Sequence, residues 1–176
     1  MNKKLKLWEL NRPTVEEFKQ QEKFPIVVTL DNIRSLSNVG TFFRTADAFN
    51  VSKIILGGIT AHPPHREIQK TALGATESVE WEYHSDLIDV IKDFKNQGYT
   101  IYAIEQTEKT ILLNEIKLAS NQKHLLIFGN EVDGVQQELV DLADFVLEVP
   151  QYGTKHSLNV SVCAGVVLWE FVRGWK

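Results

Sequence analysis

The sequence predicts an α/β fold, in which one parallel β-sheet has helices on both of its faces. Beyond Pro25, apolar runs of strand length alternate with amphipathic segments of helix length, which is the order found in sheets built from strand–helix–strand units. The strand candidates are continuous apolar runs, as in strands that are buried on both faces. The 176 residues, 43% of them hydrophobic, suffice for one domain with a sizeable core.

The first 24 residues differ in character from the rest of the chain. They are polar and charged, and Trp8 and Phe18 are their main apolar side chains. We expect an N-terminal extension over residues 1–24 that contains a short helix and is anchored by these two side chains. A single domain over residues 25–176 follows it.

The first half of this domain predicts three strands and three helices. The β-branched run at 25–32 predicts the first strand. A helix follows at 38–49, where Phe42, Ala46 and Phe49 are spaced to share one buried face. The remaining elements of this half are a strand at 53–58, a helix at 65–75, a strand at 78–83 and a helix at 86–98, with a glycine near the end of each helix.

The second half predicts three more strands and two helices. The strands are expected at 99–106, 123–131 and 145–150, and the helices at 136–143 and 158–174. Ligands of such sheets bind outside the carboxyl ends of the strands. We therefore expect functional side chains in the loops at 31–40, 57–65, 104–110, 128–135 and 149–159.

Composition and motifs argue against several classes of protein. Nineteen basic against twenty-three acidic residues give a net charge of −4, which argues against coating nucleic acid through bulk charge but permits a local basic patch. Neither a G-x-G-x-x-G motif after the first strand nor a P-loop motif is present, so a dinucleotide dehydrogenase or P-loop NTPase is not expected. The five histidines are scattered, and we expect no metal site.

The single cysteine, Cys163, excludes an internal disulfide framework and fits a reducing compartment. It lies in an apolar helix without a base nearby in the sequence, so a core thiol is favoured over a nucleophile. No apolar run approaches the roughly 18–20 residues of a membrane span, and the N-terminus lacks the apolar core of a signal peptide. We expect a cytoplasmic protein.

Four polar residues are candidates for a site. Glu131 follows a buried strand, and Ser157 and Asn159 precede the last helix. Each has a structural interpretation, as a turn residue or a helix cap, and a functional one at the ligand edge of the sheet. Arg44 lies within the apolar helix at 38–49. It is either a surface arginine or a side chain aimed at an anion near the helix N-terminus.

Three segments together resemble a known family. They are "NVGTFFRTADAF" (38–49), "LIFGNEVDGV" (126–135) and "VPQYGTKHSLNVSVCAGVVLWEF" (149–171). In order and spacing they resemble the three motifs of the SpoU/TrmH-type RNA ribose 2′-O-methyltransferases of the SPOUT superfamily. "QKTALGA" (69–75) resembles a fourth, weaker family segment. The resemblance extends over about residues 26–172, and the S-L-N-V-S core of the third motif is its most specific part.

The resemblance implies a parallel α/β sheet whose C-terminal segment threads a deep trefoil knot. It also implies S-adenosylmethionine as the cofactor, held by three loops of the knot. The cofactor-binding residues expected from these loops are Ile104, Gly129, Val149, Ser157 and Leu158. Family members work as homodimers, in which the partner helps to complete the RNA site.

The implied activity is methylation of a ribose 2′-hydroxyl in tRNA or rRNA. Its implied catalytic residues are Arg44, Asn38, Glu131, Ser157 and Asn159. A guanidinium stays protonated in proteins, so we expect Arg44 to act by charge and positioning rather than as a base. Asn38 is expected to order its loop. Glu131 is expected to orient Arg44 or Asn159. Ser157 and Asn159 are expected to position the cofactor and the ribose.

A local basic patch for RNA has five candidates: Arg34, Arg66, Lys70, Lys155 and His156. The alternative to an enzyme is a knotted RNA-binding or scaffold protein that has lost catalysis. The presence of the complete polar set favours the enzyme.

The final helix carries more apolar residues than one face needs against its own sheet. We expect a homodimer that uses this helix, unless the N-terminal extension covers it through Trp8 and Phe18. The residues concerned are Val166, Val167, Trp169, Phe171 and Val172, with Trp175 just beyond.

Overall fold

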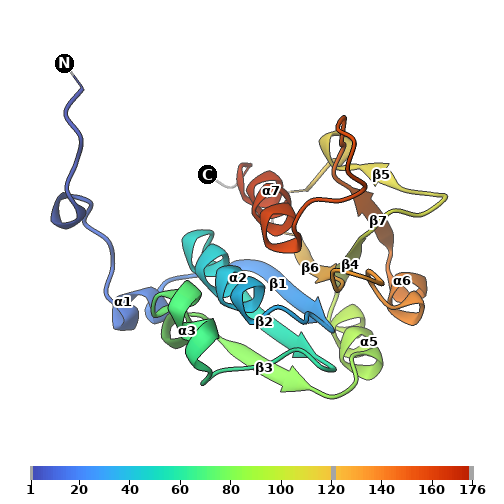
Figure 1. Ribbon diagram of the computed structural model, residues 1–176, viewed down its shortest axis with the longest axis horizontal. Coiled ribbons are helices and arrows are strands. Elements are labelled where there is room, and N and C mark those ends of the chain that lie inside the picture. Colours follow the sequence, from blue (N-terminus) through green and yellow to red (C-terminus); the bar gives the residue numbers. More distant parts are fainter. Residues whose placement is uncertain (1, 120–121, 175–176) are drawn as a thin grey trace.

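The computed structural model describes residues 2–119 and 122–174. Seven strands form one sheet in the order β3-β2-β1-β6-β4-β7-β5, and all neighbours are parallel (Figure 1). The predicted fold class is therefore confirmed. The strands are β1 (Phe24–Asp31), β2 (Val51–Gly57), β3 (Trp81–His84), β4 (Tyr99–Ile104), β5 (Ile111–Leu112), β6 (Lys123–Phe128) and β7 (Phe145–Glu148).

The strand order reverses at β1. The chain adds β2 and then β3 on one side of β1, and β6 lies on its other side with β4, β7 and β5 beyond. A reversal of this kind opens a crevice at the carboxyl edge of a parallel sheet. At that edge Phe128 of β6 pairs with Ile104 of β4, and Ile104 pairs with Leu147 of β7. The last residues of these three strands are therefore neighbours.

Helices cover both faces of the sheet (Figure 1). On one face, Phe42 of α2 packs edge-on against Phe128 of β6, with ring centroids 5.3 Å apart, and α3, α4 and α7 join the same core. On the other face, Ile91 of α5 and Leu139 of α6 are fully buried. The helices are α1 (Val15–Gln20), α2 (Leu36–Ala48), α3 (Arg66–Ala72), α4 (Ala75–Ser78), α5 (Ile88–Asn96), α6 (Gln137–Leu142) and α7 (Val160–Val172), with 3-10 turns η1 (Leu7–Glu9) and η2 (Leu113–Glu115).

The predicted strands and longer helices are confirmed, with shifts of a few residues at their ends. α2 begins at Leu36 because the Ser35 hydroxyl accepts the amide of Asn38, 3.3 Å away, and caps the helix. The four-residue α4 and the two-residue β5 were not predicted. A strand as short as β5 has no apolar pattern of its own, and its pairing with β7 defines it.

The N-terminal extension is anchored by one of its two predicted side chains. Thr14 and Glu17 form a reciprocal capping box at the start of α1, and Phe18 in that helix is buried. Trp8 is 75% exposed, so the prediction that it anchors the extension is wrong. The extension runs outward from α1 and not over α7 (Figure 1).

Within residues 2–119 and 122–174, no helix is both long enough and apolar enough to span a bilayer.

Candidate active site

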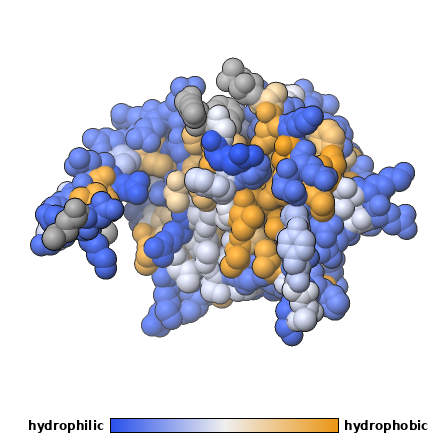
Figure 2. Space-filling view, turned by 90° about the horizontal axis from the view of Figure 1, so that it is seen from above, coloured by the Kyte–Doolittle hydropathy of each residue, from blue (hydrophilic) through white to orange (hydrophobic). Residues whose placement is uncertain are grey.

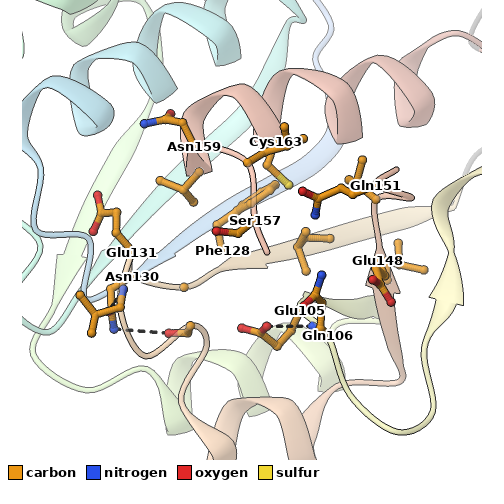
Figure 3. A pocket seen from close by; sticks show the side chains of 18 residues that line it. Glu105, Gln106, Phe128, Asn130, Glu131, Glu148, Gln151, Ser157, Asn159 and Cys163 are labelled. Carbon is orange, nitrogen blue, oxygen red and sulfur yellow. Dashed lines mark hydrogen bonds between the residues drawn. The ribbon is translucent and has the colours of Figure 1, made fainter. Parts of the chain in front are cut away.

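A pocket of about 440 Å³ opens at the carboxyl ends of β4, β6 and β7, beside the start of α7 (Figure 3). This volume is in the range of small-molecule sites. Asn159 and Glu131 lie toward one side of the pocket, and Glu105 and Gln106 lie across from Asn159 (Figure 3). The pocket is lined by residues 104–106, 128–132, 134, 147–149, 151, 157–160 and 163.

All five residues expected to bind the cofactor line this pocket. Three separate loops contribute them, which follow β4, β6 and β7 in turn. The structure thus brings the predicted loops together, because these three strands are neighbours in the sheet. The residues are Ile104, Gly129, Val149, Ser157 and Leu158.

The loop after β6 turns so tightly that it leaves no room for a side chain at Gly129. A Cβ there would collide with the backbone of Gly134 and Val135. Asn130 and Gly134 exchange backbone hydrogen bonds of 3.1 and 3.2 Å across the turn. Gly134 has a φ of +72°, a conformation that glycine adopts without strain. Backbone therefore forms this wall of the pocket, and a ligand can approach it closely.

Four polar side chains form a directed chain of hydrogen bonds beside the pocket. Asn38 donates from Nδ2 to Glu131 Oε1 at 2.7 Å, and Asn159 donates from Nδ2 to Asn38 Oδ1 at 3.2 Å. The Ser161 hydroxyl lies 2.7 Å from Asn159 Oδ1 and donates to it. A carboxylate only accepts, so Glu131 fixes which way the Asn38 amide faces, and Asn38 then fixes Asn159.

Glu131 is held in its charged form. Desolvation by itself would raise its pKa, but the hydrogen bond from Asn38 and those from backbone amides, including Arg34 and Ser35, outweigh it. The pKa of Glu131 therefore lies below its ordinary value. Glu131 hydrogen-bonds to Asn38 rather than to Arg44, and it orients Asn159 through Asn38, which agrees with one of the two expectations for it.

Asn159 has both of the roles considered for it. It is the N-cap of α7, and its Oδ1 accepts the amide of Ser161 at 3.0 Å. The same side chain belongs to the hydrogen-bond chain and lines the pocket. Ser157 lies two residues before this cap and also lines the pocket. The cap interpretation therefore applies to Asn159, and Ser157 faces the ligand space.

Two carboxylates that were not predicted from the sequence support the pocket. Asp31, fully buried at the end of β1, accepts the Gln136 amide at 2.7 Å and the Gln136 side chain at 2.6 Å. Burial raises the pKa of Asp31 despite these hydrogen bonds. Glu105 accepts the amide of Val135 at 3.0 Å. Both carboxylates hold the loop that follows β6.

Cys163 packs partly against the core, as predicted, and it also lines the pocket. Burial, aided by the negative charge of Glu105, raises the pKa of its thiol to about 11. At neutral pH the thiol is therefore protonated and a poor nucleophile.

Arg44 does not line the pocket. It is the ninth of thirteen residues in α2 and so lies beyond the first turns of that helix. Along α2, Arg44 lies between Gly40 and Asp47. Gly40 packs against α3, and Asp47 accepts a hydrogen bond from Ser78 of α4. The side chain is exposed. Throughout the described ranges, no group hydrogen-bonds or ion-pairs with its guanidinium.

The five candidates for RNA contacts fall into two groups. Arg34 lies near the pocket, where its amide faces Glu131 at 3.4 Å and its guanidinium is 3.3 Å from Asp133. Lys155 and His156 are exposed on the loop that leads into α7. The second group lies on the exposed side of α3 and consists of Arg66 and Lys70.

Comparison with known proteins agrees with this architecture. The model of the SpoU rRNA Methylase family matches residues 25–169. A tRNA (guanosine(18)-2′-O)-methyltransferase of Thermus thermophilus is 30% identical over 165 residues, which are 94% of this chain and 83% of that protein.

Two solved structures are similar in fold. The Aquifex aeolicus TrmH/SpoU tRNA modifying enzyme has a TM-score of 0.78 and 27% identity, covering 90% of this chain and 79% of its own. An AdoMet-bound rRNA methyltransferase from Sinorhizobium meliloti has a TM-score of 0.81 and 28% identity, covering 90% and 60%. With its family match over most of its length, the chain belongs to the SpoU family of RNA methylases.

Proposed function

We propose that this protein transfers a methyl group from S-adenosylmethionine to a ribose 2′-hydroxyl of tRNA or rRNA. The observation that carries the proposal is the three-loop pocket, whose wall at Gly129 is bare backbone, next to the polar chain that ends at Glu131. The related Thermus thermophilus enzyme is named for this chemistry on tRNA, and the Sinorhizobium meliloti enzyme binds AdoMet.

The pocket suits a ligand with a sulfonium and an ammonium group. Glu105, Glu131 and Glu148 line it, and Lys155 on the neighbouring loop is exposed rather than paired with them. Ile104, Gly129, Val149 and Leu158 would hold the cofactor by backbone and apolar contact. The cofactor supplies an electrophilic methyl group.

The polar chain of the site would position the acceptor. Methyl transfer requires the 2′-oxygen to lie in line with the methyl group. The second amide hydrogens of Asn38 and Asn159 and the hydroxyl of Ser157 are the groups that would orient the ribose. Arg44 would bind the adjacent phosphate and stabilise the negative charge that develops on the 2′-oxygen as its proton passes to water.

Calorimetry with S-adenosylmethionine, followed by methylation of total tRNA and rRNA with radiolabelled cofactor, tests the proposal. We expect binding at one site per chain and label on a ribose 2′-oxygen of one RNA class. A folded sample that fails to bind the cofactor would overturn the proposal. Binding without transfer to any RNA would instead indicate the non-catalytic RNA-binding alternative.

We further propose a homodimer formed through α7. Val162, Val166 and Trp169 recur at helical spacing and are 54%, 42% and 60% exposed, which is an apolar stripe without cover from the extension. Figure 2 views the side on which α7 lies in Figure 1 and shows apolar side chains gathered in its middle. Val167 and Phe171 are buried in the chain's own core, so the face left for a partner is the one with Val162, Val166 and Trp169.

We expect wild type to sediment as a dimer and Trp169→Glu to sediment as a monomer, because a carboxylate would be buried without a partner in the interface. Ile59→Glu, at a side chain that is 66% exposed and lies elsewhere, is the control that should remain dimeric. A wild type that is monomeric at all concentrations would contradict the dimer. Trp175, also expected near this interface, lies outside the described residues.

The trefoil knot implied by the family resemblance stays a prediction. The three pocket loops that the knot would contain lie together at the carboxyl edge, which supports it.

A further inference from the structure

The loop between β7 and α7 carries a large aromatic side chain that no residue within 2–119 and 122–174 covers. Tyr152 is 96% exposed, whereas Gln151 beside it lines the pocket. The loop is tied at two later points. Gln106 donates from Nε2 to the backbone oxygen of His156 at 3.3 Å, and Asn159 caps α7. We call residues 149–159 the arch. Tyr152 lies on it between Gln151, which lines the pocket, and the two held residues, His156 and Asn159.

The arch is positively charged. Residues 149–159 contain a lysine and a histidine and no aspartate or glutamate. Within the described part of the chain, the side chains of Tyr152, Lys155 and His156 have no hydrogen bond, ion pair or ring contact. Two carboxylates of the pocket, Glu105 and Glu148, already accept hydrogen bonds from Val135 and Thr110 respectively.

An exposed aromatic ring next to an unpaired cation fits single-stranded RNA. Every base offers a π-face that stacks on such a ring, and the adjacent phosphate is complementary to the cation. Bases inside a duplex are already stacked on both sides and cannot use the ring. The placement at the pocket mouth matters, because a base held there would bring its own ribose toward the pocket.

We propose that Tyr152 is a stacking platform for an unpaired base and that Lys155 contacts the phosphate beside it. The site then accepts nucleotides from loops or single strands and rejects those within a helix. This inference rests on the proposed function and names the substrate class of that site.

The test measures binding of a fluorescently labelled short oligoadenylate and of a duplex RNA of equal length. Wild type should prefer the single strand. Tyr152→Ala should weaken its binding on the order of tenfold, and Tyr152→Phe, which keeps the ring, should bind as wild type does. Lys155→Ala should reduce the salt dependence by about one phosphate contact. Asn96→Ala, at an exposed side chain at the end of α5, should change neither.

Three results would overturn the inference: wild-type binding by Tyr152→Ala, equal binding of single strand and duplex, or a changed sedimentation of Tyr152→Ala, which would show that a second copy covers the ring. S-adenosylmethionine calorimetry on the same samples separates the two proposals. Failure of wild type to bind the cofactor would refute the proposed function, while an unchanged cofactor affinity with unchanged RNA binding in Tyr152→Ala would refute only the platform.

Discussion

Gly129→Ala is expected to reduce S-adenosylmethionine affinity by about tenfold or more, because each hydrogen bond lost from a displaced backbone wall costs about 1–3 kcal/mol. The added methyl group would collide with backbone atoms of Gly134 and Val135 rather than with a flexible side chain. The loop can relieve the collision only by moving outward, and that movement displaces the backbone wall of the pocket. Calorimetry gives the affinity directly.

Gly153→Ala is the matched control for this change. It lies in the loop before α7 and is not among the residues that line the pocket, and a Cβ there meets nothing within 4 Å. Its cofactor affinity should equal that of wild type. Circular dichroism and thermal unfolding will show whether Gly129→Ala retains its sheet. A folded Gly129→Ala with wild-type affinity would show that the cofactor does not use this wall.

Arg44→Ala is expected to slow single-turnover methylation by roughly 10²–10³-fold, equivalent to about 2.7–4 kcal/mol, the usual effect of removing one preorganised electrostatic contact. Arg44→Lys should be nearly as slow, because lysine keeps the charge and loses the planar fork that grips a phosphate. Stability should hardly change, since the side chain is exposed and has no partner within the described ranges. Cofactor affinity should also be unchanged, because Arg44 does not line the pocket.

Arg12→Ala provides the comparison for Arg44. Arg12 is an exposed arginine in the N-terminal extension, and its removal should leave the rate unaltered. If Arg44→Ala turns over at close to the wild-type rate, Arg44 is a surface arginine. That is the first of the two interpretations considered for this residue, and the anion-binding interpretation would then be wrong.

Local patterns were enough to predict the elements that bear the site. The β-branched run of β1 and the glycine after α5 are signals contained within a few residues, and Gly98 has the positive φ that such a helix end requires. The loops holding Ile104, Gly129 and Ser157 followed from the rule that parallel sheets bind ligands at their carboxyl edge. That edge was predictable because the carboxyl ends of parallel strands meet there, whatever the detailed order of the strands.

What the sequence did not reveal depends on contacts between distant segments. Asp31 and Gln136 are 105 positions apart, and neither residue carries a local sign of the other. The sequence signal for Asp31 was an acidic residue at the end of an apolar strand, which is also typical of an ordinary turn. The direction of Arg44 depends on which faces of α2 the neighbouring helices occupy, and Trp8 was misplaced because apolar character alone does not say whether a side chain finds a partner.

The hydrogen bond between Asn159 and Asn38 has a consequence for protein synthesis. It joins residues that lie 121 positions apart, so the ribosome makes Asn38 roughly 6–24 s before Asn159 at its usual rate of ~5–20 residues per second. Throughout that interval the nascent chain has β1 and α2 without the segment that completes the site. A product of premature termination before Asn159 is therefore expected to lack methyltransferase activity.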